Sequence, residues 1–176
     1  DFEPHAIRGT RRLIDRRAFN RQTIILTFAS ALVSLAFITF TSAVPLWLVK
    51  ENGVPTDAPL LGLALGSFSV AAAFGAVVGG VLAPRIGTII TTVGSLLAAV
   101  VAFSVLLLVP AGAGTLIAGA ITGFMLYASQ PLLIVAAQAL APHAPTTAAG
   151  LVIGIGTGIA GLLYVGSGAL QSIIGL

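Results

Sequence analysis

The chain has 176 residues, of which 57% are hydrophobic and only 7% are charged, and its mean hydropathy is +1.11. Soluble chains are typically about 25% charged, and a domain folded in water needs charged and polar cover, so this composition excludes an ordinary soluble domain. The absence of cysteine also excludes disulfides, thiolate metal sites and cysteine nucleophiles. We therefore expect an all-α membrane protein built as a multi-pass helical bundle.

The charge is concentrated at the start of the chain, because the only formally charged side chain beyond Asp57 is Arg85. Six of the eight basic residues precede the first apolar run: Arg8, Arg11, Arg12, Arg16, Arg17 and Arg21. The positive-inside rule makes residues 1–22 a cytoplasmic basic connector, and anionic-lipid contact is an added possibility. A nucleic-acid site would need a soluble fold with interleaved aromatic residues, and only Phe2 and Phe19 are nearby. We therefore expect no nucleic-acid partner.

Five apolar segments are long enough to cross a membrane as helices, which takes about 20 residues each. Glycine and proline clusters separate them, as is typical of helix ends. These clusters are Asn52-Gly53 with Val54-Pro55, Pro84 with Gly87, Pro110-Ala111-Gly112, and Pro142 with Pro145. We predict transmembrane helices at about 23–49, 59–82, 88–109, 114–140 and 147–170.

The loop charges predict the orientation of these helices. With the N-terminus in the cytoplasm, Lys50, Glu51 and Asp57 lie outside, whereas Arg85 and His143 lie inside. The chain then finishes at the outer surface. Arg85 on the cytoplasmic side agrees with the positive-inside rule, and two acids offset Lys50. We expect a multi-pass protein of the cell (inner) membrane.

Glycines repeat along the second and fifth predicted helices. Gly150, Gly154 and Gly158 recur at every fourth position, so they share a helix face where another backbone can approach closely. The second helix has a similar character, with Gly62, Gly66, Gly75 and Gly79. We interpret these faces as tight helix–helix interfaces, with ligand contact as the alternative.

An internal repeat links the same two helices. Residues 80–87 and 168–175 share Gly, Leu, Ile and Gly at matching places, and they close helices on opposite sides of the membrane. That arrangement is typical of an inverted repeat of three-helix units. If the unit has three helices, the chain stops one helix short of six. Asp1 in place of a starting Met also indicates that the chain begins inside a longer protein.

Hydroxyl residues form a stripe on the first predicted helix, with Phe37 filling a gap. The stripe consists of Thr23, Thr27, Ser30, Ser34 and Thr41. Their spacing places them on one face, which predicts that they point inward rather than toward lipid. Two interpretations remain: hydrogen bonds between helices, each worth about 0.6 kcal/mol, or the wall of a polar cavity. Ser34, Phe37 and Thr41 lie nearest mid-membrane and are the cavity candidates.

The fourth predicted helix carries a phenol and an amide close to the bilayer centre. Tyr127 and Gln130 precede Pro131, which cannot donate its backbone hydrogen bond and should bend or loosen the helix. An amide at that depth costs free energy unless it is paired or hydrated. The combination favours a substrate cavity, with a packing role as the alternative. Gln138, two turns lower, is a candidate for the cytoplasmic mouth.

No Asp, Glu, Lys or Arg lies inside the five predicted spans, so this segment contains no intramembrane proton relay or ion site. His5 and His143 stand apart in loops, so we expect no metal site. No nucleophile elbow with its acid and histidine partners is present, and no charged ring or carbonyl filter of a channel is visible. We expect no enzyme, no catalytic residue and no cofactor.

Four stretches carry a family resemblance. Residues 44–53 (Val-Pro-Leu-Trp-Leu-Val-Lys-Glu-Asn-Gly) look like the end of a seventh transporter helix, and residues 128–138 with Leu140 and Pro142 resemble a tenth. Residues 149–168 are similar to an eleventh helix, and residues 80–87 occupy the place of the cytoplasmic loop after the eighth. Together they resemble the C-terminal half of a major facilitator superfamily transporter, in its fosmidomycin-resistance-like efflux branch.

The resemblance implies roles for the helices. The first and fourth would line a central cavity, the second and fifth would slide against the other half, and the third would face lipid. The residues expected to serve helix packing and gating are Gly80, Arg85, Gly87, Pro131, Gly150, Gly154 and Gly158. Pro84 stands where the family's loop normally has an acid, and Ser172 and Ile173 replace an acid and a base in the matching loop. Charge locks that stabilise one conformation are therefore expected to be absent from this half.

We expect the C-terminal half of a secondary active transporter that exports a small molecule or drug by alternating access. Its partners would be the lipid bilayer, a small-molecule substrate and the N-terminal half of the same transporter. Acids in that other half would have to supply any proton coupling. The alternative is a non-transporting membrane scaffold or a degenerate half-transporter, whose glycine-rich faces would serve assembly only.

Overall fold

The computed structural model describes residues 21–142 and 144–174, and all regular structure in this part is helical. The helices are α1 (Arg21–Lys50), α2 (Pro59–Ile86), α3 (Thr88–Leu108), α4 (Ala113–Leu140) and α5 (Pro145–Ile174). All five are long and apolar enough to cross a membrane, so the predicted all-α membrane fold is confirmed. Residues 1–20 of the predicted connector, which include His5, lie outside the described residues, and so does His143.

Prolines interrupt these helices less than the sequence suggested. We expected α2 to end near Leu82, before Pro84, but it continues to Ile86 and ends at Gly87. The φ of Gly87 is +98°, and its N–H donates to the carbonyl oxygen of Ala83 at 2.9 Å. Helix α4 likewise runs unbroken through Pro131. Unpaired backbone groups are costly in lipid, so a helix that loses one hydrogen bond at a proline still keeps the others.

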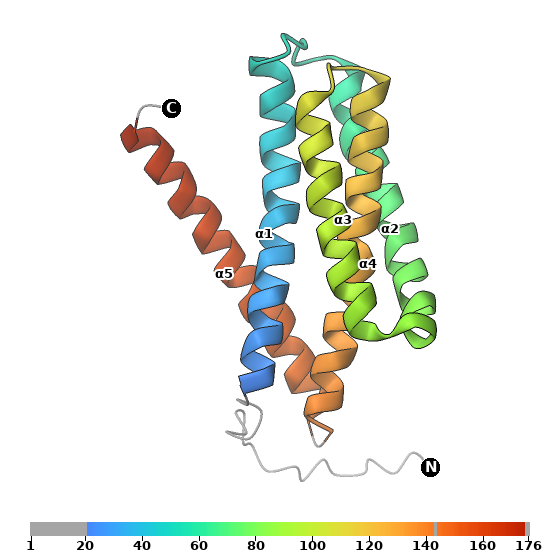
Figure 1. The fold of residues 1–176 in the computed structure, drawn as a ribbon. Helices are drawn as coiled ribbons and strands as arrows, with labels where there is room; N and C mark the ends of the chain where they lie inside the picture. The colour runs from blue at the N-terminus through green and yellow to red at the C-terminus, as the bar shows by residue number, and fades with distance from the viewer. Residues whose placement is uncertain (1–20, 143, 175–176) are drawn as a thin grey trace, which may run out of the picture.

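The five helices run along the length of the bundle, with the axes of α1 to α4 close to parallel and that of α5 oblique (Figure 1). The α1–α2 and α3–α4 loops lie at one end, and the α2–α3 and α4–α5 turns lie at the other. The most extensive contact is between α2 and α4, followed by α1 with α5 and α3 with α4. Helix α4 is therefore the central element of the described bundle.

Helices α2 and α4 touch backbone to backbone through three glycines. A Cβ atom at Gly75 would collide with the carbonyl oxygen of Phe124, and one at Gly79 would collide with that of Ala128. Gly123 of α4 lies in the same way against the carbonyl oxygen of Phe68. Small residues permit this approach, and van der Waals contact of this kind drives helix association where lipid removes the hydrophobic effect. Across the same interface, the Ser67 hydroxyl donates to the carbonyl oxygen of Leu116 at 3.3 Å.

Helix α5 uses a different glycine from those that the spacing singled out. A Cβ at Gly156 would lie 3.0 Å from the Ser30 hydroxyl oxygen and 3.2 Å from the backbone nitrogen of Ala31. Gly150, Gly154 and Gly158 have no atom within 4 Å of such a Cβ among the described residues. Beyond the contact, α5 leans away from α1 (Figure 1). The predicted glycine face therefore has no neighbour in the part of the chain that the structure describes.

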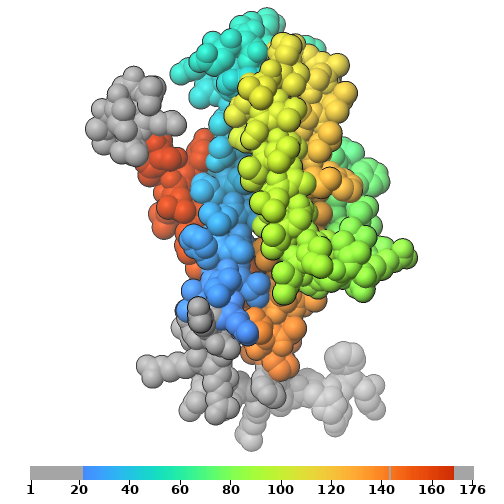
Figure 2. All heavy atoms as spheres, in the orientation of Figure 1, coloured from blue at the N-terminus to red at the C-terminus, as the bar shows by residue number. Residues whose placement is uncertain are grey.

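Helix α3 forms an outer wall of the bundle (Figure 2). Its buried residues include Thr91, Ser95 and Ala99, at every fourth position, and α3 packs mainly on α4. Large apolar side chains cover its other sides, with Ile89 78% and Leu108 84% exposed. In a membrane these side chains lie in hydrocarbon, which suits a lipid-facing position for α3.

The glycine contact between α2 and α4 predicts a position-specific effect on stability. Replacing Gly79 with alanine forces the two backbones apart, and we expect a loss of about 1–3 kcal/mol, as for other overpacked cores. Its neighbour Gly80 is exposed and has nothing within 4 Å of a Cβ, so Gly80→Ala is the matched control. Thermal denaturation in detergent micelles, followed by circular dichroism, measures both. Equal midpoints for the two variants would contradict the packing described.

Candidate functional site

An aromatic cluster near mid-depth joins four helices. The rings of Phe40 and Phe68 are stacked, with centroids 4.0 Å apart and planes inclined by 22°. Phe37 approaches Phe68 at 5.9 Å, and Phe103 of α3 approaches Phe40 at 6.2 Å. Aromatic pairs at these separations add stability beyond their buried area. Phe40 and Phe68 are fully buried, so they form the inner part of the cluster.

Tyr127 of α4 completes the cluster at its edge. Its ring meets that of Phe37 edge to face, with centroids 5.7 Å apart and planes at 76°. It also approaches Phe68 at 6.4 Å. Phe37 and Tyr127 are both half-buried, unlike Phe40 and Phe68. The structure thus brings together two candidate residues, from α1 and α4, at the accessible side of a rigid group of rings.

Gln130 follows Tyr127 by about one helical turn. Its Oε1 atom is buried and has no hydrogen-bond partner among the described residues. Most buried polar atoms in proteins have a partner, so an acceptor without one calls for a specific explanation. A bound ligand or a water molecule that donates a hydrogen bond provides one.

Pro131 adds a second acceptor beside the first. In an α-helix its N–H would donate to the carbonyl oxygen of Tyr127, and proline has no N–H. Among the described residues no side chain donates to that oxygen; the nearby Ser129 hydroxyl donates instead to the carbonyl oxygen of Leu126, at 2.8 Å. The helix itself is continuous through Pro131, and the effect that follows from the chemistry of proline is the loss of one donor to the Tyr127 carbonyl oxygen.

The hydroxyl stripe of α1 divides between two environments. Ser30 lies against Gly156 of α5, whereas Thr41 lies one turn beyond the Phe37 ring. The Thr41 hydroxyl donates to the carbonyl oxygen of Phe37 at 3.0 Å, and the Thr27 hydroxyl donates to the carbonyl oxygen of Thr23 at 2.9 Å. Both hydroxyls donate within α1, so they do not form the hydrogen bonds between helices that were one of the two interpretations of the stripe. A cavity wall made by Ser34, Phe37 and Thr41 stays a prediction.

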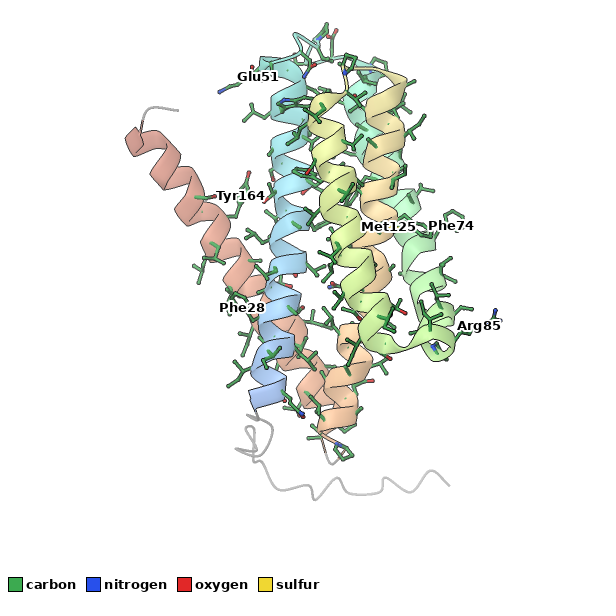
Figure 3. All side chains as sticks on the ribbon, in the orientation of Figure 1. Phe28, Glu51, Phe74, Arg85, Met125 and Tyr164 are labelled. Atoms are coloured by element: carbon green, nitrogen blue, oxygen red, sulfur yellow. The ribbon has the colours of Figure 1, made fainter. Side chains whose placement is uncertain are left out.

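The other candidate residues lie away from the aromatic cluster. Gln138 is half-buried near the end of α4. Arg85 extends away from the bundle at the α2–α3 turn (Figure 3), and Gly80 is exposed on α2 in the preceding turn. Gly87 closes that turn with its positive φ. These residues form no common site with Tyr127.

Two hollows in the described part of the chain lie outside the candidate site. One of about 500 Å³ opens between α1, α3 and α4, and one of about 210 Å³ lies between α1 and α5. None of the six cavity candidates lines either hollow. The hydroxyls of Ser104 and Thr122 line the larger one, but they donate to carbonyl oxygens of their own helices at 2.9 and 2.8 Å. Apart from the hydroxyl of Thr39, which also lines it, the larger hollow therefore offers an apolar surface.

Sequence reasoning missed Phe40, Phe68 and Phe103. The available signal was the presence of aromatic residues near the middle of three different predicted spans. Periodicity along each helix could not show that these rings meet, because their contact depends on how α1, α2 and α3 are placed relative to one another. Within the described residues, no group of three His, Asp or Glu side chains is placed to hold a metal ion.

The aromatic stack predicts a second effect on stability. Replacing Phe68 with alanine leaves a cavity against Phe40, Phe37 and Tyr127, and we expect a loss of about 3 kcal/mol, the low end for buried phenylalanine. Phe74, on the same helix, is 64% exposed, so Phe74→Ala is the control and should change stability little. Unfolding in mixed micelles of detergent and denaturant compares the two. A Phe74 variant as unstable as the Phe68 variant would refute this assignment of the core.

Comparison with known proteins places this bundle in a family. The model of the Major Facilitator Superfamily matches residues 2–165. No match is found among curated proteins or among solved structures. The matched range contains α1 to α4 and most of α5, and hence the whole aromatic cluster with Gln130. Its five membrane-spanning helices and this match make the chain a transporter-type, multi-pass membrane protein. The chain belongs to the major facilitator superfamily.

Proposed function

We propose that the chain is the C-terminal half of a secondary active transporter that exports a small molecule or drug by alternating access. The observation that carries this proposal is the contact of Phe37 with Tyr127, one helical turn from Gln130, whose Oε1 has no hydrogen-bond partner among the described residues. It joins α1 and α4, the helices that the family resemblance assigns to the central cavity. The efflux direction and the drug class come from the resemblance to the fosmidomycin-resistance-like branch.

The open glycine faces support a partner half. Gly62 and Gly66 on α2, like Gly150 and Gly154 on α5, have nothing within 4 Å of a Cβ in the described chain. Faces of small residues allow close approach of other helices. We propose that the N-terminal half of the transporter packs on these faces and that the two halves rock about the central site.

The charge distribution indicates which half of the transporter would supply proton coupling. In the described chain, ionisable side chains of the Asp, Glu, Lys and Arg types occur only in loops and in the end turns of the helices. A proton relay usually depends on an acid or base buried in the membrane. We propose that any coupling to protons uses acids of the N-terminal half. We also propose an inner-membrane location with the N-terminus in the cytoplasm, because the Arg-rich start favours that side.

Export by variants of Tyr127 and Gln130 tests the proposal. In the intact protein, Gln130→Ala and Tyr127→Ala should each reduce about tenfold the export of a compound that the unmodified protein is first shown to export, the effect of losing one strong contact to substrate. Val135 lies on the same helix and is 60% exposed, so Val135→Ala should export normally. Accumulation assays in cells with matched protein levels measure all three.

The same assay separates a transporter from a membrane scaffold. A scaffold needs neither the phenol nor the amide for a transport step. If both variants are expressed normally and export is unchanged, the aromatic face has only a packing role and the export function of this site is refuted.

A further inference from the structure

We propose that the face formed by Phe37, Tyr127 and Gln130 recognises a neutral aromatic molecule that carries a hydrogen-bond donor, such as a phenol or an indole. The inference rests on the proposed function, because it names the substrate class of the same site. Three features of the described residues lead to it: a half-buried aromatic pair, an acceptor without a partner beside a carbonyl group that has lost its helical donor, and the absence of ionic groups at this depth.

The aromatic pair favours a planar ring as ligand. Phe37 and Tyr127 meet edge to face. The ring of Phe37 also packs against Phe68, which in turn is stacked on Phe40. A further ring can join such a group in the same edge-to-face or offset arrangement. Because the rings behind are buried, the pair is already fixed, and binding orders few side chains.

The two acceptors require a donor from the ligand. The Oε1 atom of Gln130 is buried without a partner in the described chain. The carbonyl oxygen of Tyr127 loses its helical donor at Pro131. The two residues are three positions apart on α4, so about one turn of helix separates them. A site with unpaired acceptors discriminates against an analogue that lacks the donor, because its acceptors then stay unpaired.

The charge of the ligand follows from its surroundings. Tyr127 is close to the middle of α4, and no Asp, Glu, Lys or Arg lies within the central turns of the described helices. An unpaired charge removed from water is strongly disfavoured. A neutral donor such as a hydroxyl or an indole N–H pairs with the two acceptors at far lower cost than an ammonium group.

Three probes of similar size test the inference on the intact protein in lipid nanodiscs. They are 1-naphthol, which is neutral and carries a donor, 1-methoxynaphthalene, which lacks the donor, and the cation of 1-naphthylmethylamine. Dissociation constants are measured by fluorescence, with empty nanodiscs subtracting the partition into lipid. We expect 1-naphthol to bind about tenfold more tightly than either of the other probes.

Two variants assign the preference to Gln130. Gln130→Met keeps the length of the side chain and removes one of the two acceptors, so it should reduce the advantage of 1-naphthol severalfold and leave the binding of 1-methoxynaphthalene unchanged. Gln130→Glu adds a charge and should shift the preference toward the cation. Val135→Ala is the control and should leave all three constants unchanged. The comparison of probes on the unmodified protein decides the matter even if a variant fails to fold.

Specific outcomes overturn the inference. Equal binding of 1-naphthol and 1-methoxynaphthalene, or tightest binding of the cation, refutes the substrate class while leaving the export function intact. If no probe binds and the Tyr127 and Gln130 variants export normally, both the substrate class and the proposed function are refuted.

Discussion

The close contact of α2 with α4 determines the position of everything else in this bundle. Apolar side chains gain nothing by leaving lipid for one another, so helices in a membrane associate where their surfaces fit closely. Gly75, Gly79 and Gly123 let the two backbones touch. Gly123 lies against the backbone and the ring of Phe68, so this contact also sets where that ring stands. The ring cluster, and Tyr127 at its edge, follow from that position.

Helices α2 and α5, which the predicted internal repeat pairs, pack against their neighbours in opposite ways. In the alignment that pairs Gly80 with Gly168, Phe68 falls on Gly156. A large residue of α2 meets a glycine of α4, whereas a glycine of α5 meets Ser30 and Ala31 of α1. Gly62 and Gly66 fall on Gly150 and Gly154, and all four are open. The two helices therefore share open glycine positions on one face, whereas at the contact within the bundle α2 has a phenylalanine and α5 has a glycine.

The sequence was sufficient for the fold class and insufficient for the contacts. Hydropathy and length predict five helices because the requirement of the membrane is one-dimensional: about 20 apolar residues in a row. Helix ends were harder, as Pro84 shows, since a proline near the last turn removes one hydrogen bond without ending the helix. The spacing of Gly150, Gly154 and Gly158 could show a shared face, but the partner of that face is a tertiary property. Tyr127 and Gln130 stood out because polar groups at mid-depth are costly, whereas Phe68 resembled every other apolar residue.

Hydroxyl groups that bond within their own helices have a mechanical consequence. Apart from the Ser67 bond, every side-chain hydrogen bond found among the described residues stays within one helix or its adjoining loop. Directional bonds therefore do little to lock α1 and α5 onto α2, α3 and α4. A displacement of α1 along α2, α3 and α4 therefore breaks no side-chain hydrogen bond among the described residues, and it must move Phe37 and Phe40 past the rings that they contact. The packing of aromatic rings, rather than pairing of charges, then sets how readily α1 moves against its neighbours.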